Sequence, residues 1–171
     1  MGVGKTTVSR YLGKRLHGEE VDVDRWIVEK DGRPIPEIFE KDGEQAFRDM
    51  ETEAIKELGS NDGKVLSCGG GAVLRPENVE ALKKNGMIVL LTARPETVLK
   101  RVGDGKSRPA LGGEVTVAHI TELMERRRAA YEAAADVTVA TDGRSPEEIA
   151  EEIAGIVEKI ICSATRKKGE E

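Results

Sequence analysis

The sequence predicts one α/β domain in which a parallel sheet lies between two layers of helices, a three-layer α/β/α sandwich. Short apolar runs alternate with longer helical patterns along the chain, and no repeat or low-complexity stretch interrupts this order. The 171 residues suffice for one domain with a core but not for two ordinary ones. Strands separated by helices pair in parallel through right-handed crossovers, and such sheets bind ligands at the carboxyl ends of their strands.

The elements are expected to alternate from a helix at the start to a helix at the end. Each expected strand is a short, mostly uncharged apolar run between turn signals, and the four runs are residues 20–24, 65–67, 87–92 and 137–140. Apolar residues recur with helical spacing between them, which predicts helices at residues 5–16, 35–59, 75–84, 95–102, 115–134 and 146–161. The domain is expected to span residues 1–162, followed by a charged tail at 163–171 whose residues 165–171 are expected to fray.

The composition excludes several classes of protein. With 38% hydrophobic, 35% charged and 3% aromatic residues, the chain is typical of a folded α/β protein with an aliphatic core. Its net charge of -5 leaves no broad basic surface for nucleic acid, so an anionic ligand must be bound by local arginines. No apolar run approaches the roughly 20 residues of a membrane span, and the N-terminus does not resemble a signal peptide. We therefore expect a cytoplasmic protein without a nucleic-acid or membrane partner.

The cysteines and histidines do not indicate a metal site. Cys68 and Cys162 lack metal-type spacing, and two cysteines do not form a disulfide framework, so both are interpreted as buried or incidental thiols. His17 and His119 have no carboxylate or cysteine partner at ligand spacing and are interpreted as structural or surface residues. For Trp26, a place in a substrate pocket and a place in the core both remain open.

The chain begins with half of a phosphate-binding motif. MGVGKTT matches the end of the pattern G-x-x-x-x-G-K-[ST] at Gly4, Lys5 and Thr6. Backbone N–H groups of such a loop surround the β-phosphate, the lysine bridges β- and γ-phosphate oxygens, and the threonine hydroxyl binds Mg²⁺. An ordinary glycine-rich helix start is the alternative for half a motif. The pattern's first glycine would fall two positions before Met1, so we expect the chain to lack its first strand.

Further motifs begin in the strand expected at 20–24. Asp22 and Asp24 form an Asp-x-Asp at the end of the expected strand 20–24, where strand alternation would direct both side chains to one face. Downstream, I-x-x-I-F, G-E and F-R-x-x-E occur at residues 35–39, 43–44 and 47–51, and the strand expected at 65–67 is followed closely by Gly69, Gly70 and Gly71. A lone Asp-x-Asp is usually a turn, but together these motifs resemble the shikimate kinase family over about residues 1–160.

The resemblance implies a fold and an activity. Shikimate kinases are P-loop enzymes related to nucleoside-monophosphate kinases, and they transfer the γ-phosphate of ATP to the 3-hydroxyl of shikimate in aromatic amino-acid biosynthesis, with Mg²⁺. Their strand order is 2-3-1-4-5, with the first strand in the middle of the sheet. Its loss here would leave the strands at 65–67 and 87–92 roughly 10 Å apart, twice the usual spacing.

The resemblance also assigns roles to single residues. Asp22 joins Thr6 at the magnesium ion, while Asp24 hydrogen-bonds the acceptor hydroxyls and takes the proton of the attacking one. Arg48 and Arg127 bind the shikimate carboxylate in the bidentate way that suits a guanidinium. The glycines at residues 69–71 let the sugar-like ring approach the backbone. The catalytic set implied in this way is Lys5, Asp24 and Arg108.

A glycine-rich segment at about residues 103–115 is interpreted as a lid. By resemblance, Arg108 closes over the transferring phosphoryl group, whose negative charge it stabilises, while Arg101 lies against the adenine opposite Pro146. The loop TDGRSPEEI, which contains Arg144, resembles the adenine-binding loop of the family. The nucleotide-binding residues implied are Gly2, Val3, Gly4, Lys5, Thr6, Thr7, Arg101, Arg108, Arg144 and Pro146.

Two other functions remain open on the sequence. Another small-molecule P-loop kinase, such as a gluconate kinase, would share the phosphate loop and the lid, although two carboxylate-binding arginines and the Gly-Gly-Gly run argue against it. A non-catalytic ligand-sensing or regulatory domain of the same descent is favoured by the incomplete phosphate motif. In each case we expect a monomer with a small-molecule ligand.

Overall fold

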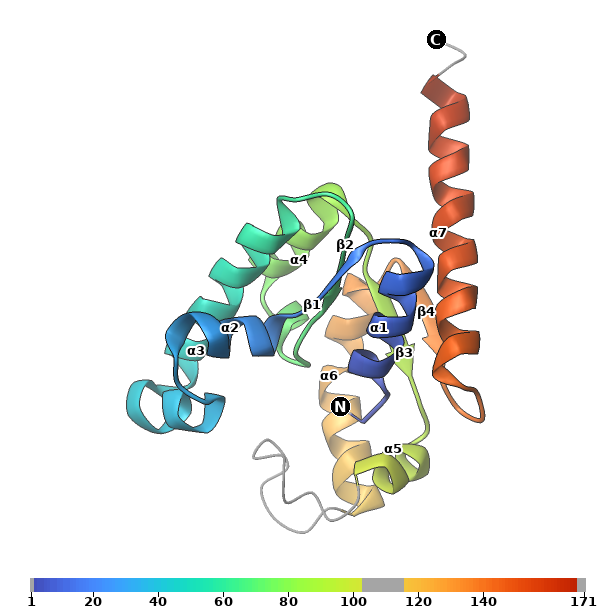
Figure 1. The fold of residues 1–171 in the computed structure, drawn as a ribbon. Helices are drawn as coiled ribbons and strands as arrows, with labels where there is room; N and C mark the ends of the chain where they lie inside the picture. The colour runs from blue at the N-terminus through green and yellow to red at the C-terminus, as the bar shows by residue number, and fades with distance from the viewer. Residues whose placement is uncertain (1, 103–115, 169–171) are drawn as a thin grey trace.

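A computed structural model describes residues 2–102 and 116–168, with side chains through residue 163. Helices and parallel strands alternate in it, as Figure 1 shows. The elements are α1 (Lys5–Arg15), β1 (Glu19–Asp22), α2 (Val23–Asp31), α3 (Ile35–Gly59), β2 (Lys64–Ser67), the 3₁₀ turn η1 (Ala72–Leu74), α4 (Pro76–Asn85), β3 (Val89–Thr92), α5 (Pro95–Val102), α6 (Val117–Ala134), β4 (Val137–Ala140) and α7 (Pro146–Lys168). None of the described helices is long and apolar enough to cross a membrane.

The strands form two separate parallel pairs. β1 pairs with β2, with Asp22 opposite Ser67, and β3 pairs with β4, with Thr92 opposite Ala140. Among the described residues no ladder of hydrogen bonds joins β2 to β3. A separation of these two strands is what the sequence analysis expected, although the missing first strand that it invoked stays a prediction.

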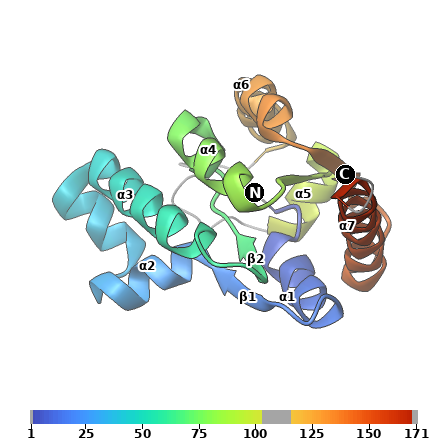
Figure 2. The same ribbon diagram turned by 90° about the horizontal axis from the view of Figure 1, so that it is seen from above.

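Each strand pair has its own apolar core. The β1–β2 pair packs with α2, α3 and η1, whereas the β3–β4 pair packs with α1 and α7. A third, smaller cluster joins the phosphate loop to α5 and α6. The helix α1 contacts β1, β2 and α7, and it therefore links the two larger cores, as seen from above in Figure 2. The most buried large side chains are Val23, Ile38 and Ile55 in the first core, Val139, Ile149 and Ile153 in the second, and Val98 and Ile120 in the third.

The expected elements depart most from the structure at α2, a helix that was not expected, and at the end of α7. The strand expected at 20–24 ends at Asp22, because the Asp22 carboxylate accepts a hydrogen bond from the Arg25 backbone N–H and so caps the start of α2. The helix expected at 146–161 instead continues to Lys168, into the residues expected to fray, and extends well beyond the rest of the molecule in Figure 1. Its lysines and arginine are good helix formers, and positive charge is favourable at a helix C-terminus.

Candidate active site

The phosphate loop runs from Gly2 into α1. Gly2 and Gly4 have φ angles of 67° and 96°, a backbone conformation that side chains disfavour, and Lys5 is the first residue of α1. Val3 between them is buried and anchors the loop in the third core. A Cβ atom on Gly2 would lie 2.7 Å from Val102 and 2.9 Å from Val98, so the loop packs directly on α5. The backbone N–H groups at the start of α1 thus have a fixed position, as phosphate binding requires.

Asp22 and Thr6 meet at the carboxyl end of β1. The Thr6 hydroxyl donates to Asp22 Oδ2 at 3.1 Å, while the other carboxylate oxygen caps α2. Thr7 follows in the first turn of α1, where its N–H donates to the Gly4 carbonyl. A hydroxyl and a carboxylate side by side are oxygen ligands of the kind that Mg²⁺ prefers, with the remaining positions left to water and phosphate.

Asp24 lies in the first turn of α2 and not on a strand. The expectation that it shares a strand face with Asp22 is therefore wrong, although the helix start still keeps the two carboxylates close enough to repel each other. Burial raises the pKa of Asp24, and the negative charge of Asp22 raises it further, while Lys5 and Arg48 act in the opposite direction. A carboxylate with a raised pKa is a better proton acceptor near neutral pH than an ordinary one.

Arg48 is held by two carboxylates of its own helix. Its Nη1 donates to Glu51 Oε2 at 2.7 Å, and its Nε and Nη2 reach Glu44 Oε1 at 3.3 and 3.2 Å. The Glu51 side chain is fully buried, and its Oε1 atom has no hydrogen-bond partner among the described residues. Burial raises the pKa of Glu51, and the hydrogen bond from Arg48 opposes that rise.

The side chains of the site converge on the three glycines after β2. A Cβ on Gly69 would lie 2.9 Å from both Asp24 Oδ1 and Glu51 Oε1, and one on Gly71 would lie 2.2 Å from Arg48 Nη1. A Cβ on Gly70 would meet Tyr131 and Arg127 of α6 at 3.1 and 3.2 Å. The three glycines thus make room for functional side chains of α2, α3 and α6, which a side chain in the run would displace.

Arg127 reaches the site from α6. It is half-buried, and its Nη1 lies 3.5 Å from the Gly70 carbonyl oxygen, while Tyr131 one turn further donates to the same oxygen at 2.6 Å. Arg126 and Arg128 are exposed and pair with Glu122 and Glu125 on the outer face of the helix. The central arginine of the three therefore faces the glycine run, and its neighbours face elsewhere.

Arg101 ties α5 to the phosphate loop and to the segment after β4. Its Nη1 donates to the Val3 carbonyl at 3.1 Å and to the Thr141 hydroxyl at 2.9 Å, and its Nη2 donates to the Thr141 carbonyl at 2.8 Å. These bonds lie in the guanidinium plane, so they fix the plane and leave its faces for a stacking partner. Thr141 is fully buried.

The other residues expected at the nucleotide are less closely joined to the loop. The Arg144 guanidinium donates to the carbonyls of Ala140 and Glu148 and pairs with Glu152 at 2.5 Å, so it faces the start of α7. Pro146 is the first residue of that helix. Arg108 and the expected lid at 103–115 lie outside the described residues.

Sequence reasoning gave no role to three residues that the structure places at the site. Glu51 was only part of a motif, although a charged residue on the apolar face of α3 is a signal that it has a buried partner. Tyr131 lies one turn after Arg127 in α6. Thr141 carried no signal, because its contacts with Arg101 join segments that are distant in the chain.

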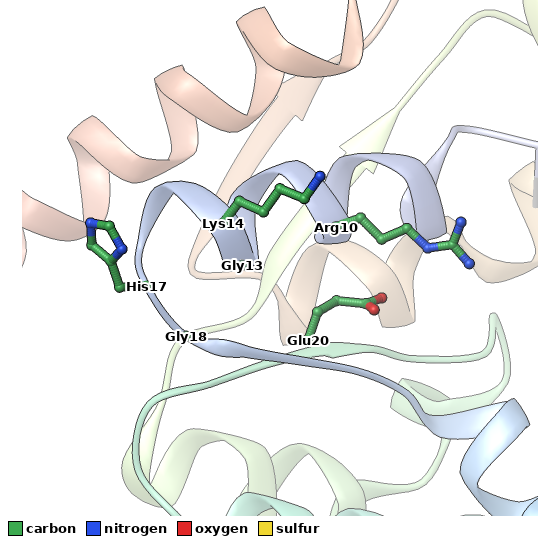
Figure 3. A pocket seen from close by; sticks show the side chains of 6 residues that line it. All are labelled: Arg10, Gly13, Lys14, His17, Gly18 and Glu20. Atoms are coloured by element: carbon green, nitrogen blue, oxygen red, sulfur yellow. The ribbon is translucent and has the colours of Figure 1, made fainter.

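A hollow of about 510 Å³ lies elsewhere, between the end of α1 and the start of β1. Figure 3 shows that the Arg10 and Lys14 side chains extend the same way along α1 while His17 points the opposite way, so the three do not converge. Glu20 beneath them accepts a hydrogen bond from Ser9 at 2.7 Å. This hollow is at the amino end of β1, away from the phosphate loop, and it has no arrangement that would hold a ligand.

Known proteins are similar to the chain over most of its length. The family model described as shikimate kinase matches residues 1–158. The shikimate kinase of Geobacter sulfurreducens is 45% identical over 157 residues, which cover 92% of this chain and 86% of that protein. The shikimate kinase of Enterococcus faecalis is 45% identical over 154 residues, with 90% and 91% covered.

Solved structures give the same result for the fold. Shikimate kinase from Acinetobacter baumannii, solved in complex with shikimate, is 38% identical with a TM-score of 0.87, and the match covers 93% of this chain and 89% of that one. Shikimate kinase from Aquifex aeolicus is 36% identical with a TM-score of 0.79, and 92% of each chain is covered.

Proposed function

The chain belongs to the shikimate kinase family, and on this premise we propose how its side chains carry out the reaction of that family. It is an ATP-dependent phosphotransferase whose acceptor is shikimate, an acid with three ring hydroxyls. The relatives cover nearly the whole chain, so another P-loop kinase, such as a gluconate kinase, and a non-catalytic domain are both disfavoured. The residue roles below are our proposal.

One observation carries the proposal: two guanidinium groups and a carboxylate gather over one glycine run. Arg48 lies against Gly71, Arg127 lies near Gly70, and Asp24 lies against Gly69. Within the described residues Arg127 has no carboxylate partner, so a half-buried positive charge is ready for an anionic group. Both arginines would bind the carboxylate of shikimate, and the ring would lie on the glycines, which present no side chain to it.

Asp24 would then face a ring hydroxyl. Its carboxylate orients the attacking oxygen and takes the proton as the new O–P bond forms and the bond to the leaving ADP oxygen breaks. The burial that raises the pKa of Asp24 makes it a stronger base for this step. Lys5, at the start of α1, would contact the β- and γ-phosphates, and the loop of residues 2–7 would hold them through backbone N–H groups.

The residues at the end of β1 fit a magnesium ion. Thr6 and Asp22 offer one hydroxyl and one carboxylate, and the described residues contain no cluster of three or more His, Cys, Asp or Glu that could hold a metal on its own. This fits Mg²⁺, which typically binds one or two protein oxygens together with substrate phosphates and water. When bound, it would neutralise charge on the phosphates.

The finer features of the fold and setting remain proposals. We propose that the two strand pairs are the halves of one parallel sheet in a three-layer sandwich, which the likeness to the Acinetobacter enzyme supports. A monomer in the cytoplasm is also proposed, on the sequence arguments given above.

The test is ADP release by this chain with MgATP, measured with and without shikimate. Shikimate-dependent release is expected from the chain and not from Lys5→Ala, which lacks the charge at the phosphates. Gluconate serves as the control acceptor. ADP release that shikimate does not increase, or that gluconate increases equally, would contradict the proposed function, and shikimate binding without turnover would support the sensing domain.

A further inference from the structure

The Gly70 carbonyl oxygen faces two donors of α6 at different distances. Tyr131 Oη donates to it at 2.6 Å, a short hydrogen bond, whereas Arg127 Nη1 is at 3.5 Å, the outer limit of such a bond. Both side chains come from one face of α6, one turn apart, and both lie against the Gly70 α-carbon. The two donors therefore face the same acceptor.

The neutral Tyr131 hydroxyl lies closer to the Gly70 carbonyl oxygen than the charged Arg127 guanidinium does, although charge favours the guanidinium as donor. A guanidinium forms a charge-assisted hydrogen bond with a carbonyl that is stronger than one from a neutral hydroxyl. A half-buried carbonyl without a donor is costly, so it would draw in the nearest N–H group. Tyr131 already satisfies the Gly70 carbonyl, and Arg127 stays at 3.5 Å with its remaining N–H groups available.

We propose that Tyr131 is a positioning residue that occupies the Gly70 carbonyl and thereby keeps Arg127 available for the carboxylate of the acceptor substrate. This rests on the proposed function, in which Arg127 binds that carboxylate. A trans peptide directs its C=O and N–H groups to opposite sides, so the same bond also fixes the Gly71 N–H. No described residue accepts a hydrogen bond from that N–H.

Tyr131→Phe tests the proposal because it removes the hydroxyl and keeps the ring. We expect the KM for shikimate to rise about 3- to 10-fold, the loss of a typical hydrogen bond, with the KM for ATP unchanged. The matched control is Tyr11→Phe, which removes a hydroxyl from the exposed side of α1 and should leave both constants unchanged. A Tyr131→Phe enzyme with a lower melting temperature but an unchanged KM for shikimate would show a merely structural role and overturn the proposal.

Kinetic constants of Tyr131→Phe measured in an Arg127→Ala protein show whether Tyr131 acts through Arg127 or independently of it. If it acts through Arg127, Tyr131→Phe adds no further rise in the KM for shikimate once Arg127 is absent. If the same 3- to 10-fold factor appears in both backgrounds, Tyr131 acts without Arg127 and the proposal fails.

A crystal structure of Tyr131→Phe decides the point without any activity. The distance from Arg127 Nη1 to the Gly70 oxygen should shorten from 3.5 Å to about 2.9 Å, and an unchanged distance would overturn the proposal. If the unaltered chain shows no shikimate-dependent turnover, the proposed function is refuted. An unchanged distance in Tyr131→Phe refutes only the role of Tyr131, so the two results can be told apart.

Discussion

At the scale of single residues, Gly71 shows how closely the site is packed. The Arg48 guanidinium occupies the space of a Cβ, with its Nη1 only 2.2 Å from that position, so Gly71→Ala must displace it. The expected result is a rise of about tenfold or more in the KM for shikimate, the loss of a hydrogen bond to a charged group. Steady-state kinetics with varied shikimate measure this rise.

The control for Gly71→Ala is Gly155→Ala, because nothing lies within 4 Å of a Cβ there. An equal KM for shikimate in the two variants would refute the role of Arg48.

The raised pKa of Glu51 predicts that the stability of the protein depends on pH. Its pKa in the folded protein is raised by burial above the ordinary value of about 4.3. The folded state therefore holds a proton that the unfolded state releases, and the stability from this group, fully present below the unfolded pKa, is lost as the pH rises through the folded pKa. Urea unfolding of the chain and of Glu51→Gln measures this.

In that series, the free energy of unfolding of the unaltered chain minus that of Glu51→Gln should fall as the pH rises above about 4.3 and level off above the folded pKa. A difference that is constant or rises with pH would contradict the raised pKa. The Gln side chain carries no titratable proton, so it removes the linkage and keeps the size of the residue.

At the scale of elements, α7 contains a glycine in its interior. Gly155 is helical, and no atom would obstruct a Cβ there. Gly155→Ala should stabilise the protein by about 0.5–1 kcal/mol, because alanine loses less conformational freedom in a helix. For a chain of this size that corresponds to a rise of roughly 1–4 °C in melting temperature. An unchanged or lower melting temperature would contradict this prediction.

The elements also show what the sequence could predict. Helix 95–102 and strand 137–140 were predicted with their observed ends, because a proline or a change of hydrophobic period marks them. The predicted end of the strand at 20–24 was wrong because an aspartate such as Asp22 can lie within a strand or cap a helix. Only the structure shows its hydrogen bond with the Arg25 N–H. The motif residues Asp24, Arg48 and Arg127 could be named from the chain, whereas the contacts of Glu51, Tyr131 and Thr141 depend on tertiary packing.

At the scale of the whole molecule, the site lies where two separately packed parts meet. Asp24, Arg48 and the glycine run belong to the part built on β1 and β2. Lys5 belongs to α1 and Arg127 to α6, which pack with the part built on β3 and β4 and the phosphate loop. A substrate bound by both arginines would therefore contact both parts at once.

The split into two strand pairs has a consequence for amide hydrogen exchange. With no ladder joining β2 to β3 in the described residues, each pair can open by itself, as a separate cooperative unit. Without ligands we expect the amides of β1 and β2 to exchange at a common rate that differs from that of β3 and β4. A ligand held by both units should slow exchange in both, because it binds only the closed form. Mass spectrometry of the exchanging chain would show one shared rate, with and without shikimate and nucleotide, if the four strands instead open together.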